Sequence, residues 1–165
     1  MPMDILDRLP APVPQTRLLW EALVDLQDRT DLGIGPLGPR GIIPITGGRF
    51  RGAPGFEALS GTVLPGGADR QQVRPDGARE LDALYEMQVA DGAILTIRNR
   101  VIIDESVAGP RYAIGRVQVI APEGRWGWLN RRVFVGTMAS ARPERAAVVI
   151  RVWLVEEHPV ASSGA

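Results

Sequence analysis

Hydrophobic and polar residues alternate in the middle of the chain, between Glu80 and Val89. The alternating apolar positions are Leu81, Ala83, Tyr85, Met87 and Val89. A period of two is typical of a β-strand with one buried face. The dipeptide Asp91-Gly92 follows, which suits a two-residue hairpin turn, and residues 93–103 are then mostly apolar and β-branched. The pattern therefore predicts a β-hairpin that turns at Asp91-Gly92.

The predicted turn also fixes which residues of the hairpin face each other. A two-residue turn places Tyr85 opposite Arg98, and Ala83 opposite Arg100, all on one side of the sheet. The other side carries the polar residues Glu80, Asp82, Glu86 and Gln88. Because acidic side chains without partners belong in water, we expect the Tyr85 side, with both arginines, to face the interior. A β-bulge would reverse this assignment.

Further strands are predicted on both sides of the hairpin. Residues 111–121, 129–139 and 146–156 are expected strands. Pro44 interrupts an earlier apolar run, which indicates an edge strand or one that bends there, whereas residues 17–27 fit a strand and a helical stripe equally well. The chain as a whole holds about 8–10 strands with few helical candidates. This favours an all-β fold that closes into a single antiparallel barrel, because closure removes exposed edges.

The ends of the chain lack this patterning. Prolines punctuate residues 1–16, which we expect to form a flexible N-terminal arm with one short helical turn at residues 4–9. Residues 158–165 are small and mostly polar, and we expect them to form a disordered tail. The segment between them, residues 17–157, is predicted to be one β-barrel domain that is long enough to bury a core.

The composition and charge of the chain limit the kinds of binding partner that we expect. The 165 residues include 19 basic and 19 acidic ones, so no global field attracts the chain to nucleic acid or to an anionic membrane. The chain starts with prolines and acidic residues instead of a basic region followed by an apolar run, which argues against a secretion signal. No apolar run reaches the length of a membrane-spanning helix. We therefore expect a cytoplasmic protein with no nucleic-acid or membrane partner.

Missing residue types exclude several catalytic chemistries. The chain has no cysteine and no lysine, and its single histidine, His158, begins the predicted tail. A Ser-His-Asp triad, a Cys-His pair and a zinc site of the usual ligands are therefore excluded. The sequence holds no calcium-loop pattern of acidic residues, and its glycine pairs fit no phosphate-binding motif. We expect no metal and no cofactor, so that any catalysis uses Asp, Glu, Tyr, Arg or Asn.

Five blocks of the sequence carry a family resemblance. They read, in order, GIIPITGGRFRG, GTVLPGGAD, RPDG, DALYEMQVADGAILTIRNR and WGWLNRRVFVGT. Over residues 17–156 the chain resembles a family of small bacterial and fungal proteins known as domain of unknown function 3237. The resemblance implies a closed antiparallel β-barrel of the calycin or allene-oxide-cyclase type. It favours a strand for residues 17–27 and brings little assigned function.

Two positions differ from the family pattern. Arg70 follows GGAD where an aromatic residue is usual, and Leu84 precedes Tyr85 where an arginine is common. If either position lines the pocket of the family, the specificity of this chain has changed or its activity has been lost.

The candidate site is built on the predicted inner face of the hairpin. We assign Tyr85, Asp69 and Arg98 as candidate catalytic residues. An inward arginine holds a carboxylate or enolate oxygen and polarises a carbonyl, and a tyrosine hydroxyl beside it transfers a proton. The candidate substrate-binding residues are Arg100, Asn99, Met87, Trp128 and Asn130.

Structural roles explain the same residues. The arginines and Tyr85 are also consistent with an ion network at one end of a barrel. Asp69 is either a base at the barrel mouth or a cap at the start of a strand. Trp128 and Asn130, within the block WGWLN, suit either a pocket for a flat ligand or core packing.

Three classes of function are consistent with the predicted barrel and its candidate site. The first is a cofactor-independent lyase, isomerase or cyclase that uses acid–base groups on a small carbonyl-containing substrate, aromatic or polyketide-like. The second is a non-catalytic carrier or sensor of such a small molecule. The third is a structural homo-oligomer whose polar wall is an interface. A titratable group that points into the pocket with a shifted pKa would favour the enzyme.

Overall fold

The computed structural model describes residue 1 and residues 3–158 of the chain, so residues 159–165 of the predicted tail lie outside the described residues. The strands are β1 (Val13–Leu26), β2 (Thr30–Gly35), β3 (Gly38–Gly52), β4 (Gly61–Val63), β5 (Ala68–Val73), β6 (Arg79–Val89), β7 (Ile94–Asp104), β8 (Tyr112–Ile120), β9 (Val133–Ser140) and β10 (Ala147–His158). The helical segments are α1 (Ile5–Arg8) and η1 (Gly127–Arg131). In this described part of the chain, neither helical segment is long and apolar enough to cross a membrane. The cytoplasmic location stays a prediction.

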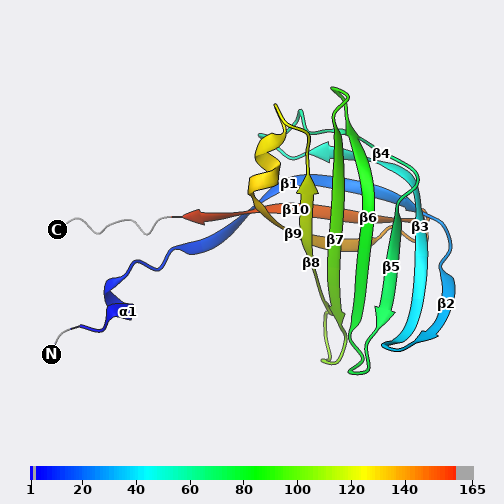
Figure 1. Cartoon of the computed structure of the whole chain (residues 1–165), viewed down its shortest axis with the longest axis horizontal. Helices are drawn as coiled ribbons and strands as arrows, with labels where there is room; N and C mark the ends of the chain where they lie inside the picture. The colour runs from blue at the N-terminus through cyan, green and yellow to red at the C-terminus, as the bar shows by residue number, and fades with distance from the viewer. Residues whose placement is uncertain (2, 159–165) are drawn as a thin grey trace.

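The strands form one antiparallel sheet that closes into a barrel (Figure 1). The order is β1-β10-β9-β8-β7-β6-β4-β3, and β3 pairs with β1 to complete the circuit. β5, like β4, lies between β3 and β6, but it pairs with a different part of each of these two strands. β2 pairs with the first part of β3. The prediction of an all-β, closed antiparallel barrel is confirmed.

The ends of β1 and β10 leave the barrel together. β1 begins at Val13, opposite His158 at the end of β10, so residues 13–16 of the predicted arm belong to a strand. The paired ends project from the barrel as a two-stranded ribbon (Figure 1). Residues 17–26, which fitted a strand and a helix equally well, are a strand, as the family resemblance implied.

The central hairpin turns where predicted, but its loop is one residue longer. The amide of Val89 donates to the carbonyl of Ala93 at 2.8 Å, and the amide of Gly92 donates to the carbonyl of Val89 at 2.8 Å. Gly92 has a φ of 95°, a left-handed conformation that glycine adopts readily. The connection is therefore a three-residue loop, in which a tight turn is followed by a left-handed residue.

The longer loop shifts the register of β6 against β7 by one residue. Tyr85 pairs with Ile97, and it faces the interior as predicted, with 2% of its surface exposed. The predicted pairing of Tyr85 with Arg98 is wrong, and so is that of Ala83 with Arg100. Because successive side chains of a strand point to opposite faces, this shift places both arginines on the outer surface.

Apolar side chains from the strands, together with Leu59 from a loop and Leu129 from η1, fill the barrel. The largest fully buried ones are Trp20, Tyr85, Leu19, Leu59, Met87, Leu95, Ile97 and Leu129. A smaller apolar cluster lies apart from this main core and consists of Leu81, Val101 and Ile103. The inner faces of β6 and β7 contribute to both clusters, so the hairpin register decides which side chains meet in the interior.

The hairpin loop gives a test of the left-handed conformation of Gly92. Gly92→Ala is expected to lower the free energy of unfolding by about 1–2 kcal/mol, because a Cβ disfavours the left-handed conformation. No atom lies within 4 Å of the Cβ position, so the backbone alone would account for the loss. Denaturant titration measures it. Gly127→Ala, at a glycine outside the left-handed region, is the control and should change stability little. Equal effects in the two variants would contradict the left-handed conformation of Gly92.

Candidate functional site

A cavity of about 110 Å³ lies inside the barrel, between the main core and the smaller apolar cluster. Apolar side chains of β1, β3 and β10 form much of its wall. Its polar side chains are Asp69, Gln71, Tyr85 and Asn99. Three of these present a buried oxygen that has no hydrogen-bond partner among the described residues: Asp69 Oδ1, Tyr85 Oη and Asn99 Oδ1. An apolar cavity with a few convergent polar groups is the usual form of a small-molecule site.

The ladder of β5, β6 and β7 arranges these side chains in layers. Asp69 pairs with Ala83, and Ala83 pairs with Asn99, so the carboxyl and amide groups flank a single methyl group. Neighbouring strands lie about 4.8 Å apart, which separates the backbones of Asp69 and Asn99 by about 10 Å. Tyr85 lies two residues further along β6, about 7 Å towards the main core. Gln71 lies two residues from Asp69 in the opposite direction.

The side chain of Asn99 packs against two glycines of the barrel wall. This side chain is buried, with 4% of the residue's surface exposed. A Cβ on Gly115 would overlap its Oδ1, and a Cβ on Gly136 would lie 3.5 Å from its amide. These two glycines pair with each other on β8 and β9. They provide the room for an amide on the inner face of the barrel.

Tyr85 presents a neutral phenol to the cavity. Its hydroxyl is buried and has no hydrogen-bond partner in the described structure. Burial raises the pKa of Tyr85 far above its usual range, because the phenolate would lose its hydration. The hydroxyl therefore stays protonated and is suited to donate a hydrogen bond.

Asp69 is the acidic residue of the cavity, and its pKa is raised. Its Oδ2 accepts a hydrogen bond from Gln71 Nε2 at 2.9 Å, whereas its Oδ1 is buried without a partner. Burial raises the pKa of Asp69 above the ordinary value of an aspartate, and the nearby charge of Asp82 adds to the rise. The hydrogen bond from Gln71 acts in the opposite direction. A half-buried carboxylate with a raised pKa is a typical proton acceptor.

The two arginines of the predicted site form an ion cluster outside the barrel. Arg98 donates to both carboxylate oxygens of Asp82, from Nε at 3.0 Å and from Nη2 at 2.8 Å. Arg100 Nε lies 3.7 Å from the same carboxylate. The hydrogen bonds from Arg98 lower the pKa of Asp82, and the charges of Arg98 and Arg100 add to this effect. The prediction that Arg98 and Arg100 point into the barrel is wrong, because it rested on a two-residue turn.

Of the other predicted binding residues, Asn99 lines the cavity, whereas Met87, Trp128 and Asn130 lie away from it. Met87 is fully buried in the main core. Trp128 stacks on Phe56, with ring centroids 6.2 Å apart. Asn130 accepts a hydrogen bond from the amide of Ala121 at 2.8 Å and donates to its carbonyl at 2.9 Å. These contacts are structural, so core packing explains this group better than ligand contact.

Sequence reasoning missed Gln71, which orients the carboxyl group of the site. Its only sequence signal is its spacing, since it follows Asp69 by two residues and shares its strand face. The two positions that differ from the family pattern, Arg70 and Leu84, are exposed and point outward. Neither of them lines the cavity.

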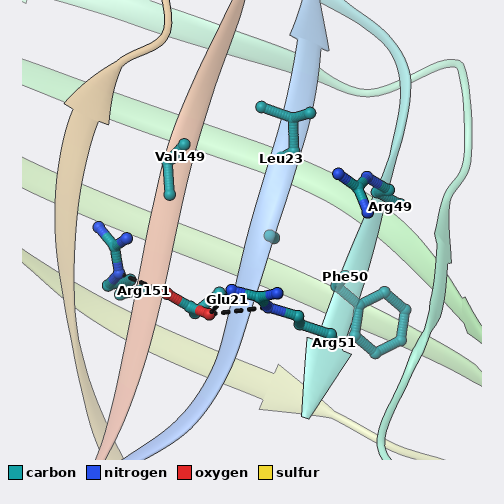
Figure 2. Close-up of a pocket in the computed structure, with 8 residues that line it drawn as sticks. Glu21, Leu23, Arg49, Phe50, Arg51, Val149 and Arg151 are labelled. Atoms are coloured by element: carbon teal, nitrogen blue, oxygen red, sulfur yellow. Dashed lines mark hydrogen bonds and ion pairs between the residues drawn. The ribbon is translucent and has the colours of Figure 1, made fainter. Parts of the chain in front are cut away.

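A second hollow, of about 230 Å³, lies on the outer surface over β1, β3 and β10 (Figure 2). Glu21 lies at its centre and accepts hydrogen bonds from Arg151 Nε at 2.8 Å and from Arg51 Nε at 2.9 Å. These two bonds, with that from Arg151 the stronger, lower the pKa of Glu21. Because this carboxylate stays ionised and paired, the hollow offers no free acid–base group. We therefore assign the candidate site to the inner cavity.

The fold and the cavity define a closed antiparallel barrel with a small internal pocket, an architecture suited to holding one small molecule. The chain belongs to the family described as "Protein of unknown function (DUF3237)", whose model matches residues 14–155. A UPF0311 protein of Rhodopseudomonas palustris is 39% identical over 88 residues, 53% of this chain and 55% of that protein. A UPF0311 protein of Clostridium acetobutylicum is 43% identical over 74 residues, 43% of this chain and 44% of that protein. The chain thus spans about half the length of the curated relatives it matches.

Solved structures share the barrel over most of the chain. A conserved protein of unknown function from Rhodopseudomonas palustris superposes with a TM-score of 0.75 at 32% identity, over 88% of this chain and 100% of that one. A β-barrel-like protein from Acinetobacter baumannii has a TM-score of 0.75 at 27% identity, over 88% and 98%. An enzyme from Penicillium herquei has a TM-score of 0.68 at 23% identity, over 90% and 98%. At that identity the likeness shows the shared fold alone.

Asp69→Asn is expected to raise the free energy of unfolding at about pH 7. The pKa of Asp69 is higher in the folded protein than in the unfolded chain, so the folded state loses stability as the pH rises between the two values. A neutral amide avoids this loss and keeps an oxygen for Gln71. Denaturant titrations should show a gain at pH 7 that disappears below the unfolded pKa of about 3.9.

Asp104→Asn is the matched control for this test. Hydrogen bonds from Ser106 lower the pKa of Asp104, so its ionised form stabilises the fold and its amide variant should gain nothing at pH 7. An Asp69→Asn variant that is less stable than the parent at pH 7 would contradict the desolvation of Asp69.

Arg98→Met tests the outward placement of the arginines. The side chains of Arg98 and Asp82 are 41% and 38% exposed, and exposed ion pairs contribute little. The free energy of unfolding is therefore expected to fall by less than about 1 kcal/mol. Asp82→Asn and the double variant complete a thermodynamic cycle. A loss of several kcal/mol would indicate that Arg98 is buried.

Proposed function

We propose that this barrel is a cofactor-independent lyase, isomerase or cyclase that removes a proton from a carbon next to a carbonyl group of a small substrate. The observation that supports the proposal is the meeting of three unpartnered buried oxygens, of Asp69, Tyr85 and Asn99, in one apolar cavity. Unsatisfied buried polar groups are rare in native proteins, and they gather where a ligand completes their hydrogen bonds.

Each group has a distinct role in the proposed reaction. Ionised Asp69 accepts the proton from the carbon, and the electron pair of the broken C–H bond forms an enolate. The hydroxyl of Tyr85 donates a hydrogen bond to the carbonyl oxygen, on which negative charge grows in the transition state. Asn99 Oδ1 accepts a hydrogen bond, which suits a hydroxyl group on the same substrate.

The fate of the enolate separates the three reaction types. In an isomerase, the protonated Asp69 returns the proton to a different carbon. In a lyase, the electron pair expels a leaving group from the neighbouring carbon. In a cyclase, the enolate carbon attacks a second carbonyl of the same molecule. The apolar wall favours every one of these outcomes, because it excludes water from the enolate.

Hydrogen–deuterium exchange tests the shared first step without knowledge of the natural substrate. The probe is methyl 4-oxopentanoate in D₂O, and proton NMR follows exchange at the carbons next to its ketone. The wild-type protein should accelerate exchange, and the rate should fall as the pH drops through the raised pKa of Asp69, since the base must be ionised. Asp69→Asn should lower the rate by about 100-fold or more, and Tyr85→Phe by about 100-fold.

Asp104→Asn and the exposed tyrosine variant Tyr112→Phe are matched controls, because both residues lie outside the cavity. Both should exchange like the parent. Exchange at the buffer rate in the presence of wild-type protein would contradict the enzyme. If the probe bound without exchanging, the alternative of a small-ligand carrier or sensor would be favoured.

A further inference from the structure

A guanidinium group lies next to the cavity and is connected to its carboxyl group. Arg29 follows β1 in the connection to β2, and its Nε donates to Gln71 Oε1 at 3.3 Å. The Nε2 of Gln71 donates in turn to Asp69 Oδ2 at 2.9 Å. One amide side chain therefore links Arg29 to the carboxyl group of Asp69.

Gly41 shows that the guanidinium lies on the inner side of the barrel wall. Gly41 is buried and pairs with Gln71 between β3 and β5, so both belong to one layer and one face of the sheet. A Cβ on Gly41 would overlap Nε, Cζ and Nη2 of Arg29. Arg29 therefore lies over the inner face in the layer next to Asp69, on the side away from the main core, where the residue is exposed to solvent.

Arg29 differs in its partners from three arginines that lie near the hollows of this protein. Arg51, Arg98 and Arg151 each form an ion pair with a carboxylate. Among the described residues, no carboxylate oxygen lies within 4.0 Å of the Arg29 guanidinium, whose hydrogen bond goes to a neutral amide. A guanidinium with free N–H groups binds a carboxylate in a two-point grip.

We propose that Arg29 binds a carboxylate group of the substrate, so that the substrate is a small oxo acid. The inference rests on the proposed function, which places the carbonyl end beside Tyr85 and Asp69. Leu81, the partner of Gln71, and Tyr85 are four residues apart on β6, so the two ends of the site are separated by about 13 Å along the backbone. Side chains from both ends reach into this space, which leaves room for a short carbon chain between carbonyl and carboxylate.

The test compares 4-oxopentanoate with its methyl ester, two probes that differ in one negative charge. Calorimetry or ligand-observed NMR measures their affinity for the full-length protein. The acid is expected to bind the wild-type protein at least about tenfold more tightly than the ester, as for a hydrogen bond to a charged group. Arg29→Met should remove this preference by weakening the acid alone, and Arg29→Lys should restore part of it. Added salt should weaken the acid and leave the ester unchanged.

Arg49→Met, which removes an arginine from the outer hollow, is the control and should keep the full preference. A merely structural role of Arg29, acting through Gln71, would weaken both probes alike and would overturn the inference. Equal binding of acid and ester to the wild-type protein, or no binding of the acid, would also overturn it. If the ester exchanged in an Asp69-dependent manner but bound as well as the acid, the proposed function would stand while this inference fell. If the acid were preferred but neither probe exchanged, the proposed function would fall.

Discussion

β1 pairs with both β3 and β10, and this pairing closes the sheet. The closure determines which inward side chains lie next to one another in the interior. Each strand of the closed circuit is held on both sides, so it cannot slip without breaking two sets of hydrogen bonds. The side-chain period is two, and a slip by one residue would exchange the inner and outer faces of a strand. The length of the loop at Gly92 therefore sets the register of β7. In this register Asn99 faces the cavity and Arg98 faces water.

The cavity carries a cost that the rest of the core must offset. A buried polar atom without a hydrogen bond costs about 1–3 kcal/mol, and the cavity contains three such oxygens. The Nε1 of Trp20 is a fourth unpartnered atom, but Trp20 does not line the cavity. A ligand that completes the hydrogen bonds of the three oxygens recovers part of this cost, and it stabilises the folded state as it binds.

The sequence predicts the local features of this site better than the long-range ones. The alternation from Glu80 to Val89 is local, so the inward direction of Tyr85 could be predicted. The register of β7 depends on one loop residue, and Asp91 is held there by contacts that the pattern does not show. Its Oδ1 accepts from the amide of Ala93 at 3.0 Å, and its Oδ2 accepts from Trp126 Nε1, 35 positions away, at 2.8 Å.

The same limit applies to the rest of the candidate site. Asp69 could be named from its block in the family resemblance, since that block is contiguous in sequence. Gln71 and Arg29 have no local pattern that marks them, because their importance comes from a contact between segments 42 positions apart. The room for Asn99 likewise depends on Gly115, which becomes its neighbour only once β7 and β8 have paired.

The origin of Arg29 in a connection between strands has an evolutionary consequence. Asp69, Tyr85 and Asn99 belong to strands of the closed ladder, where an insertion would disturb the register of the whole wall. The connection from β1 to β2 lies outside that ladder, and loops of this kind tolerate insertions and exchanges. Under the proposed function, descendants of this barrel can therefore acquire a different preference for the far end of the ligand by changing a few loop residues, while the groups proposed to act on the carbonyl are inherited intact.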